Sequence, residues 1–131
     1  MTGKVGGNMV ADGRLKAVAE CVFCRIAAGE IPSDIVYEDA DCVAFRDVNK
    51  QAPAHVLIVP REHVVNLAVA DREHRDLLGH LLLVARKVAE ADGVAESGFR
   101  VVINSNADAG QSVDHLHVHV LGGRAMRWPP G

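Results

Sequence analysis

The sequence has no excess of positive charge, no long apolar run and no even set of cysteines, and each absence argues against a class of protein. The chain carries 14 Lys and Arg against 17 Asp and Glu, a formal net charge of −3, so we expect no nucleic-acid partner. No apolar run approaches the length of a membrane span, so we expect no membrane association. Three cysteines, an odd number, argue against a disulfide framework. We therefore expect a reduced, cytoplasmic protein.

The first twenty residues also lack periodicity, and they hold four glycines. No apolar stretch follows Lys4, so we expect no secretory signal. We interpret residues 1–20 as a flexible N-terminal extension, with a short helix near residues 15–19. Residues 21–131 then form one domain, because a chain of 131 residues can build one hydrophobic core but not two.

The expected elements are several short strands and one long helix. The helix is expected over residues 71–92, between a candidate N-cap at Asp71 and a candidate C-terminal glycine, Gly93. Its apolar stripe is wider than one core-facing side requires, so it packs either against a partner subunit or deep inside the chain's own core. Because strands outnumber helices and connections are short, we expect an α+β fold with a mainly antiparallel sheet. The strands are expected at residues 35–37, 42–46, 55–59, 99–104 and 115–121, and one helical turn at 25–28.

Three alternating histidines in the last expected strand are the strongest signal in the sequence: His115, His117 and His119. Successive side chains of a strand point to opposite faces, so the three rings share one face and the intervening apolar residues share the other. Neighbouring same-face residues lie roughly 7 Å apart, which places the outer two about 13 Å apart. One phosphate group can therefore contact two of these rings but not all three, and one end histidine needs a different role.

Histidines in this pattern suit phosphate chemistry. Neutral imidazole is a nucleophile near neutral pH, and a protonated neighbour can bind a phosphate oxygen. Gly110 lets backbone N–H groups approach an anion closely, and Ser112 offers a hydroxyl to a leaving group. The alternatives are an exposed polar strand face and a metal-binding tract. We favour the catalytic interpretation, because three of the seven histidines fall in this one pattern.

The pair Cys21 and Cys24 has three interpretations: a redox pair, two small buried residues, or half of a zinc site. Redox chemistry is the weakest of these, because the surrounding sequence has no thioredoxin-like βαβ pattern. A tetrahedral zinc would need two further ligands, which histidines can supply.

The segment 115–119 resembles the His-x-His-x-His motif of the histidine triad (HIT) superfamily. The preceding Gly110-Gln111-Ser112, and the terminal Trp-Pro-Pro-Gly at residues 128–131, resemble its nucleotide-binding branch. Further matching segments are residues 30–32, 44–47, 51–55, 59–60 and 122–124, so the resemblance covers about residues 21–131.

The resemblance implies a five-stranded antiparallel sheet with one long helix and a short N-terminal helix, assembled as a homodimer. It implies an enzyme, a purine nucleoside phosphoramidase, with no organic cofactor. Such a hydrolase cleaves the P–N bond of AMP or GMP derivatives through a nucleotidyl-histidine intermediate. Acyl-adenylates are a further substrate class that the resemblance implies. The rival functions are a dinucleoside polyphosphate hydrolase or nucleotidyl transferase of the same fold, and a nucleotide-binding interaction protein.

The resemblance also assigns roles to individual residues. His117 resembles the nucleophile, His119 the phosphate-binding histidine and His55 the histidine that orients the network. Ser112 resembles the contact to the leaving group and Asp47 the contact to the ribose. The other implied nucleotide contacts are an apolar slot for the base, made by Phe23, Ile31, Phe45 and Val48, and loop contacts to the phosphate, made by Asn104, Gly110 and Gln111. Without the resemblance, Phe23, Ile31 and Phe45 would be interpreted as core residues.

Many bacterial members of the superfamily resemble this chain in a second set of residues, which holds a structural zinc. Carried over by position, the ligands are Cys21, Cys24, His63 and His115. This gives His115 the separate role that the strand geometry requires. The resemblance further implies that the C-terminal tail reaches toward the active site of the partner subunit.

Overall fold

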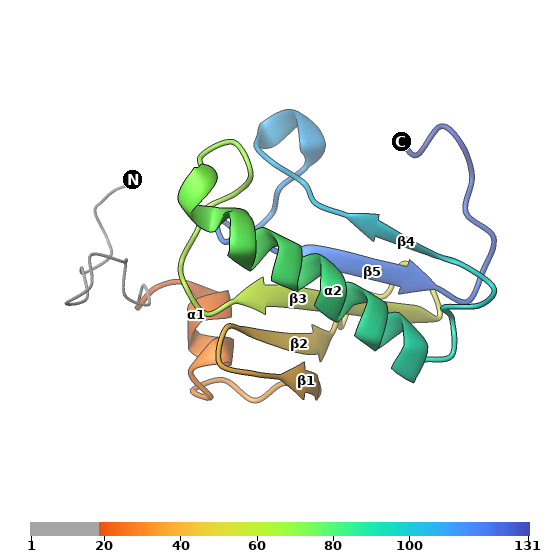
Figure 1. The fold of residues 1–131 in the computed structure, drawn as a ribbon, viewed down its shortest axis with the longest axis horizontal. Helices are drawn as coiled ribbons and strands as arrows, with labels where there is room; N and C mark the ends of the chain where they lie inside the picture. The colour runs from red at the N-terminus through yellow and green to blue at the C-terminus, as the bar shows by residue number, and fades with distance from the viewer. Residues whose placement is uncertain (1–18) are drawn as a thin grey trace.

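A computed structural model describes residues 19–131, which form a five-stranded antiparallel sheet in the order β1-β2-β3-β5-β4 (Figure 1). The strands are β1 Ile35–Glu38, β2 Cys42–Arg46, β3 Ala54–Pro60, β4 Phe99–Val102 and β5 Val118–Gly122. The α-helices are α1 Val22–Ala27 and α2 Arg75–Ala91, and the two 3₁₀ turns are η1 Arg72–His74 and η2 Ala107–Ala109. The expected α+β fold is confirmed. The expected flexible extension and most of the helix near residues 15–19 lie outside the described residues.

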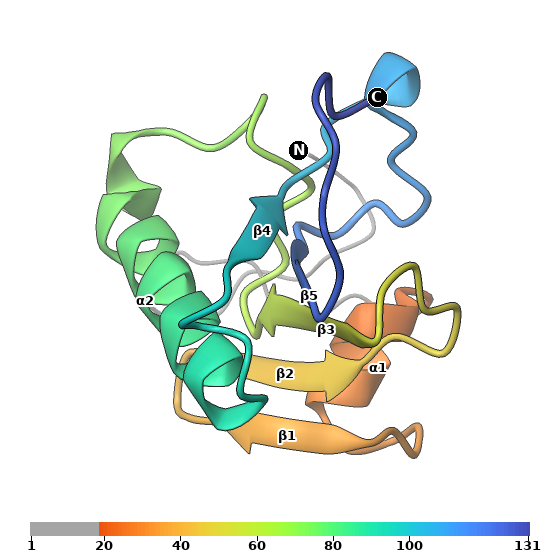
Figure 2. The ribbon, with the colours of Figure 1, turned by 90° about the vertical axis from the view of Figure 1, so that its right-hand side faces the viewer.

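The two faces of the sheet are covered by different elements, α2 on one side and α1 on the other (Figure 2). Alternation along β2 and β3 divides their apolar side chains between these faces. Ala44, Val56 and Ile58 join the cluster that packs under α2, whereas Phe45 and Leu57 join a second cluster with residues of α1. Burial on both faces explains why β3 reads as an almost continuous apolar run.

The long helix α2 begins and ends close to the predicted positions. Asp71 caps the 3₁₀ turn that precedes it: its carboxylate accepts the N–H of Glu73 at 2.9 Å, and its own N–H donates to His74 Nδ1 at 3.1 Å. Gly93 follows the helix with φ +72°, a conformation that favours glycine. The inner side of α2 is buried, but Leu82 is 51% exposed and Leu83 61% exposed, so the wide apolar stripe is only partly covered within one chain.

The last strand differs from the prediction. It was expected at residues 115–121 and instead pairs from Val118 to Gly122, because the preceding residues hydrogen-bond outside the sheet. The N–H of Leu116 donates to the carbonyl of Val64 at 2.6 Å rather than to a strand. The alternation of faces nevertheless continues: Leu116 and Val118 are buried in the cluster under α2, and the histidines between them point to the opposite face.

Candidate functional site

Two groups of histidines lie side by side on the face of the sheet opposite α2. The first contains His115 and two cysteine side chains. Cys21 caps the first turn of α1, where its Sγ accepts the N–H of Cys24 at 3.4 Å. His115 Nδ1 lies 3.3 Å from Cys21 Sγ and 3.4 Å from Cys24 Sγ. His63 Nδ1 lies 3.2 Å from Cys24 Sγ and 3.2 Å from His115 Nδ1. The structure thus brings together all four residues predicted as metal ligands.

The geometry of this Cys/His cluster fits a tetrahedral metal ion. Its four donor atoms all lie within 4.8 Å of one another, and a zinc ion with ordinary Zn–N and Zn–S bonds would need separations of roughly 3.3–3.8 Å. His115 is fully buried, and its Nε2 donates to the carbonyl of Pro60 at 2.8 Å. Since a carbonyl only accepts, the proton is on Nε2 and the Nδ1 lone pair faces the cluster. A hydrogen bond with Cys24, and further ones with the two histidines, lower the pKa of the Cys21 thiol far below its usual value, against the effect of burial.

The second group begins with His117, which is 4% exposed. Its Nδ1 lies 2.7 Å from the carbonyl oxygen of His115, so Nδ1 carries the proton and donates. In the neutral ring Nε2 then holds a lone pair. The ring of Phe23 meets that of His117 edge to face, with centroids 5.1 Å apart, and fixes its orientation from the side of α1. His117 is therefore held as the tautomer that a nucleophile requires.

His119 is oriented by a short chain of hydrogen bonds between strands β3 and β5. In the ladder, Leu57 is opposite His119, so His55 is a diagonal neighbour on the same face. The N–H of Gln51 donates to His55 Nδ1 at 3.0 Å, which places the His55 proton on Nε2. That proton is directed to His119 Nδ1 at 2.9 Å, with Asp47 Oδ2 at 3.4 Å as a second acceptor.

The consequence is that His119 carries its own proton on Nε2. Within residues 19–131 this Nε2 is buried and has no hydrogen-bond partner; this is unusual for a buried donor and makes the nitrogen a candidate donor to a ligand. Burial first, and then the neighbouring His117 and His55, lower the pKa of His119 to about 4, against the opposing effect of Asp47. The sequence suggested a protonated ring beside His117, but at neutral pH His119 is a neutral N–H donor. Its ring centroid is 5.0 Å from that of His117.

The four residues predicted to form a slot for the base occupy different environments. Phe23 and Phe45 are 7% and 4% exposed and pack edge to face with centroids 5.6 Å apart, as core residues do. Ile31 is half-buried, whereas Val48 is 101% exposed in the loop after β2. Asp47, the predicted ribose contact, keeps 17% of its side chain exposed and accepts the N–H of Asn49 at 2.9 Å.

The predicted phosphate loop lies between β4 and β5. Gly110 has φ +77° in the turn, a backbone conformation that favours glycine. Ser112 is exposed and Asn104 is half-buried. Gln111, which is also predicted to contact phosphate, uses its side-chain amide within the protein: Nε2 donates to the carbonyl of Val65 at 2.7 Å.

Sequence reasoning missed Asn66, which is 2% exposed and bonded to the same loop. Its Nδ2 donates to Gln111 Oε1 at 2.9 Å. The available signal was a single amide within the apolar stretch of residues 64–70. Such a residue is buried only if the fold supplies partners, and the sequence does not show those partners.

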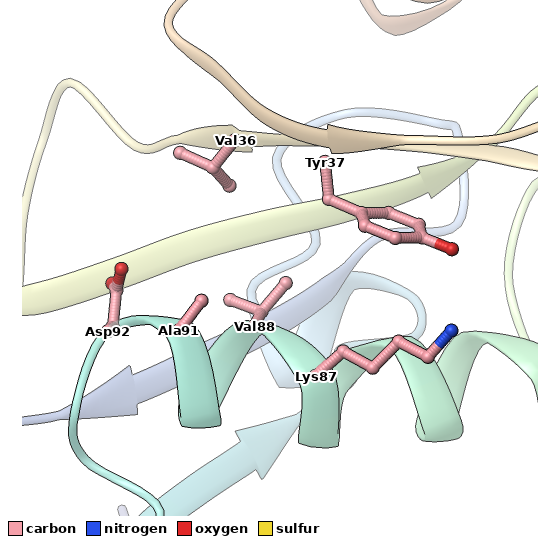
Figure 3. A pocket seen from close by; sticks show the side chains of 6 residues that line it. All are labelled: Val36, Tyr37, Lys87, Val88, Ala91 and Asp92. Atoms are coloured by element: carbon pink, nitrogen blue, oxygen red, sulfur yellow. The ribbon is translucent and has the colours of Figure 1, made fainter.

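A small cavity of about 50 Å³ lies elsewhere, between β1 and the end of α2 (Figure 3). It is lined by Val36, Tyr37, Lys87, Val88, Ala91 and Asp92. None of these is a predicted site residue, and ligand pockets are usually several times larger. Asp92 is also engaged, because Arg46 donates to both of its carboxylate oxygens at 2.9 Å. The histidines, on the opposite face of the sheet, therefore remain the candidate functional site.

No helix within residues 19–131 has the length and apolar character needed to cross a membrane.

Comparisons with known proteins find the same family along most of the chain. A family model described as the HIT domain matches residues 28–126. The 14 kDa zinc-binding protein of Zea mays is 52% identical over 112 residues, which cover 84% of this chain and 87% of that protein. An uncharacterized HIT-like protein of Synechococcus elongatus is 52% identical over 112 residues, covering 86% of this chain and 97% of that protein.

Solved structures share the fold as well. The crystal structure of a HIT family hydrolase from Legionella pneumophila has a TM-score of 0.84 and 47% identity, covering 86% of this chain and 100% of that one. A histidine triad protein from Clostridium difficile has a TM-score of 0.81 and 43% identity, covering 83% and 95% of the two chains. The predicted five-stranded antiparallel fold with one long and one short helix is confirmed.

Proposed function

Because this chain belongs to the HIT domain family, we propose that it hydrolyses the P–N bond of purine nucleoside phosphoramidates through a nucleotidyl-histidine intermediate. The observation that carries the proposal is the pairing of two ring nitrogens. His117 presents an Nε2 lone pair, and the adjacent His119 presents a buried Nε2–H that has no partner in the described part of the chain. A nucleophile beside an unused donor is the arrangement that attack on a phosphorus atom requires.

In the first step, His117 Nε2 attacks the α-phosphorus. The N–P bond to the imidazole forms as the P–N bond to the amine breaks, and the leaving amine takes a proton from solvent. The hydrogen bond from Nδ1–H to the carbonyl of His115 stabilises the positive charge that develops on the ring. Ser112 is exposed and free to direct its hydroxyl at the departing nitrogen.

In the second step, water attacks the phosphorus and gives up a proton to solvent, the bond to His117 breaks, and the nucleoside monophosphate is released. His119 donates from Nε2 to a phosphate oxygen in both steps. His55 holds this donor in place, because its own Nε2–H occupies His119 Nδ1. Asp47, whose carboxylate is partly exposed beside His55, is the proposed acceptor for the ribose hydroxyls.

The direct test is rapid quench with an adenosine phosphoramidate, followed by peptide mass spectrometry. An adenylyl group on the peptide that carries His117 supports the mechanism, and an adduct only on another residue contradicts it. A panel with guanosine phosphoramidates, acyl-adenylates and dinucleoside polyphosphates separates the proposal from its rivals. Preferred cleavage of the polyphosphates would favour the hydrolase or transferase alternative, and nucleotide binding without turnover would favour an interaction protein.

We further propose that the Cys/His cluster of Cys21, Cys24, His63 and His115 holds zinc. Two thiolates and two imidazoles are a donor set that zinc prefers, and the four donor atoms all lie within 4.8 Å of one another. A zinc-binding relative, the protein from Zea mays, is consistent with this. All four positions of the tetrahedron would be filled by protein, so the ion would be structural: it would join α1 to the segment before β5 and supply no step of the reaction. Reduced thiols are needed for such a site, which is in keeping with a cytoplasmic location.

We also propose a homodimer built on α2 and the edge strand β4. Leu82 and Leu83 are exposed on α2, and Val101 is 36% exposed on β4. Trp128 in the C-terminal tail is 83% exposed and available to a partner subunit. Light scattering should give about twice 14.0 kDa, and a monomer at micromolar concentration would contradict the proposal.

A further inference from the structure

Two interlocked side-chain amides, Asn66 and Gln111, organise the connection between β4 and β5. The Nδ2 of Asn66 donates to Asn106 Oδ1 and to Gln111 Oε1, both at 2.9 Å. Its Oδ1 accepts the backbone N–H of Ala68 at 2.9 Å and that of Val69 at 3.3 Å. Both donors and both lone pairs of this buried amide are therefore in use, and its orientation is fixed.

Gln111 is engaged to the same degree. Besides the bond from Asn66, its Oε1 accepts the N–H of Asn106 at 2.9 Å. Its Nε2 donates to the carbonyl of Val65 at 2.7 Å and to that of Val113 at 3.0 Å. A side chain used in this way cannot bind a phosphate without giving up a bond inside the protein. A fully satisfied pair of amides makes the surrounding backbone rigid.

A continuous set of hydrogen bonds leads from this amide pair to the proposed nucleophile. The carbonyl of Val113 accepts both from Gln111 and from the N–H of His115 at 2.8 Å. The carbonyl of His115 in turn accepts from His117 Nδ1 at 2.7 Å. Val113 also packs against the apolar cluster that contains Phe23, whose ring meets His117. The position of the 113–115 backbone therefore sets the position of the His117 ring.

The loop of residues 106–110 needs such support, because its own side chains do little to anchor it. Residues 106–110 are exposed, so no apolar side chain anchors them. Asn106 has φ +69°, a conformation that a non-glycine residue adopts only when its surroundings hold it there. Asn66 supplies the restraint from outside the loop, through the Asn106 side chain.

We propose that Asn66 and Gln111 are positioning residues for the reaction: together they set the backbone that carries Ser112 and orients His117. Gln111 acts through these internal bonds and not as a side-chain ligand of the phosphate. This inference rests on the proposed function for its kinetic consequences, but the structural restraint can be measured without substrate.

The kinetic experiment compares Asn66→Ala, Ser112→Ala and the double variant on adenosine phosphoramidates with good and poor leaving amines. We expect Asn66→Ala to lower kcat by about 100-fold, because small displacements of reacting groups have effects of that size. KM should change by less than about threefold, since ribose and base contacts lie elsewhere. The loss should be larger for poor leaving groups, and the two substitutions should be non-additive, because both act on Ser112.

Two further variants control for unfolding. Asn66→Asp keeps the Oδ1 acceptor and the shape but loses both Nδ2 donations, so it carries the test if Asn66→Ala does not fold. Val88 lies on the buried side of α2 and belongs to the core cluster there. Val88→Ala should lower the melting temperature without changing kcat or the leaving-group dependence. The inference is overturned if the Asn66 variants lose activity only in proportion to their unfolded fraction, or if the loss is in KM.

Amide hydrogen exchange separates this inference from the proposed function. In Asn66→Asp we expect faster exchange confined to residues 105–117, with the rest of the sheet unchanged. Unchanged exchange in that segment would overturn the positioning role. If the wild-type protein cleaves no substrate of the panel, the proposed function fails, and the exchange result alone decides whether Asn66 restrains the loop.

Discussion

The two histidine groups contrast in how their ring nitrogens are used. In the Cys/His cluster every donor atom faces another within the cluster, and the remaining nitrogen of His115 is bonded to Pro60. In the second group His119 Nε2 has no partner among residues 19–131, and His117 Nε2 keeps a lone pair. The first arrangement is closed and suits a structural role, whereas the second leaves one N–H donor and one nitrogen lone pair for a ligand. Substitutions in the two groups should therefore separate stability from catalysis.

The largest effect is expected for His117→Ala. Loss of the nucleophile should lower kcat by at least about 10⁴-fold, as for other enzymes with covalent intermediates. Nucleotide binding, measured by calorimetry with AMP, should change little because His119, His55 and Asp47 remain. Full activity in this variant would remove the basis for the contrast between the two groups.

The second effect concerns the Cys/His cluster. Cys24→Ser should lower the free energy of unfolding by on the order of 4 kcal/mol, because loss of a structural metal is among the most destabilising changes. The melting temperature would fall by about 15 °C. A chelator should have the same effect on the wild-type protein and little on the variant, while kcat of the folded fraction is unchanged. A metal content near zero in protein purified without added metal would contradict the zinc proposal.

A smaller effect is expected for His55→Phe, which keeps an aromatic ring but removes the donor to His119 Nδ1. Without that bond His119 can place its proton on the wrong nitrogen, and kcat should fall by about 10- to 100-fold, the range found when an orienting partner is lost. Asp47→Asn serves as the comparison, since it should raise KM more than it lowers kcat. A larger loss of kcat in Asp47→Asn than in His55→Phe would reverse the assigned roles.

The smallest effect is the pH dependence of stability. The pKa of His119 is about 4 in the folded protein, lowered mainly by burial, whereas an unfolded histidine has a pKa near 6.5. Between these values the unfolded chain binds more protons, so stability should fall as the pH decreases from about 6.5 to 4. In His119→Gln, denaturant unfolding at pH 7 and pH 5 should differ less than in the wild-type protein. An equal difference would show that other groups cause the decline.

The sequence was informative where a pattern is local and periodic. Alternation placed His117 and His119 on one face, and the spacing of Cys21 and Cys24 indicated half of a zinc site as one of three interpretations. The start of β5 could not be predicted, because Leu116 is a residue type common in strands. It lies outside the strand because its N–H donates to the carbonyl of Val64. That bond joins residues about fifty positions apart, and no local pattern shows it.

The parts of the site that depend on partners distant in the sequence could likewise not be predicted. Nothing in the sequence shows that His119 would be a neutral donor, since its protonation depends on burial and on the neighbouring His55 and His117. Phe23 and Phe45 illustrate the same limit: the residue type alone favours a core and the resemblance implies a base slot, and in the structure both belong to the apolar cluster packed with α1. Asn66 lacked any sequence signature of its partners.

The strand order has a consequence for how the protein folds. The middle strand β3 pairs with β5, so His55 meets His119 across a separation of 64 residues. The hairpin of β1 and β2, and its extension to β3, can form early from nearby residues, whereas β5 must close a long loop before it joins. A nascent chain would therefore hold its first three strands with one edge open until the last residues arrive, and the histidines that carry the proposed chemistry would meet only in the final step of folding.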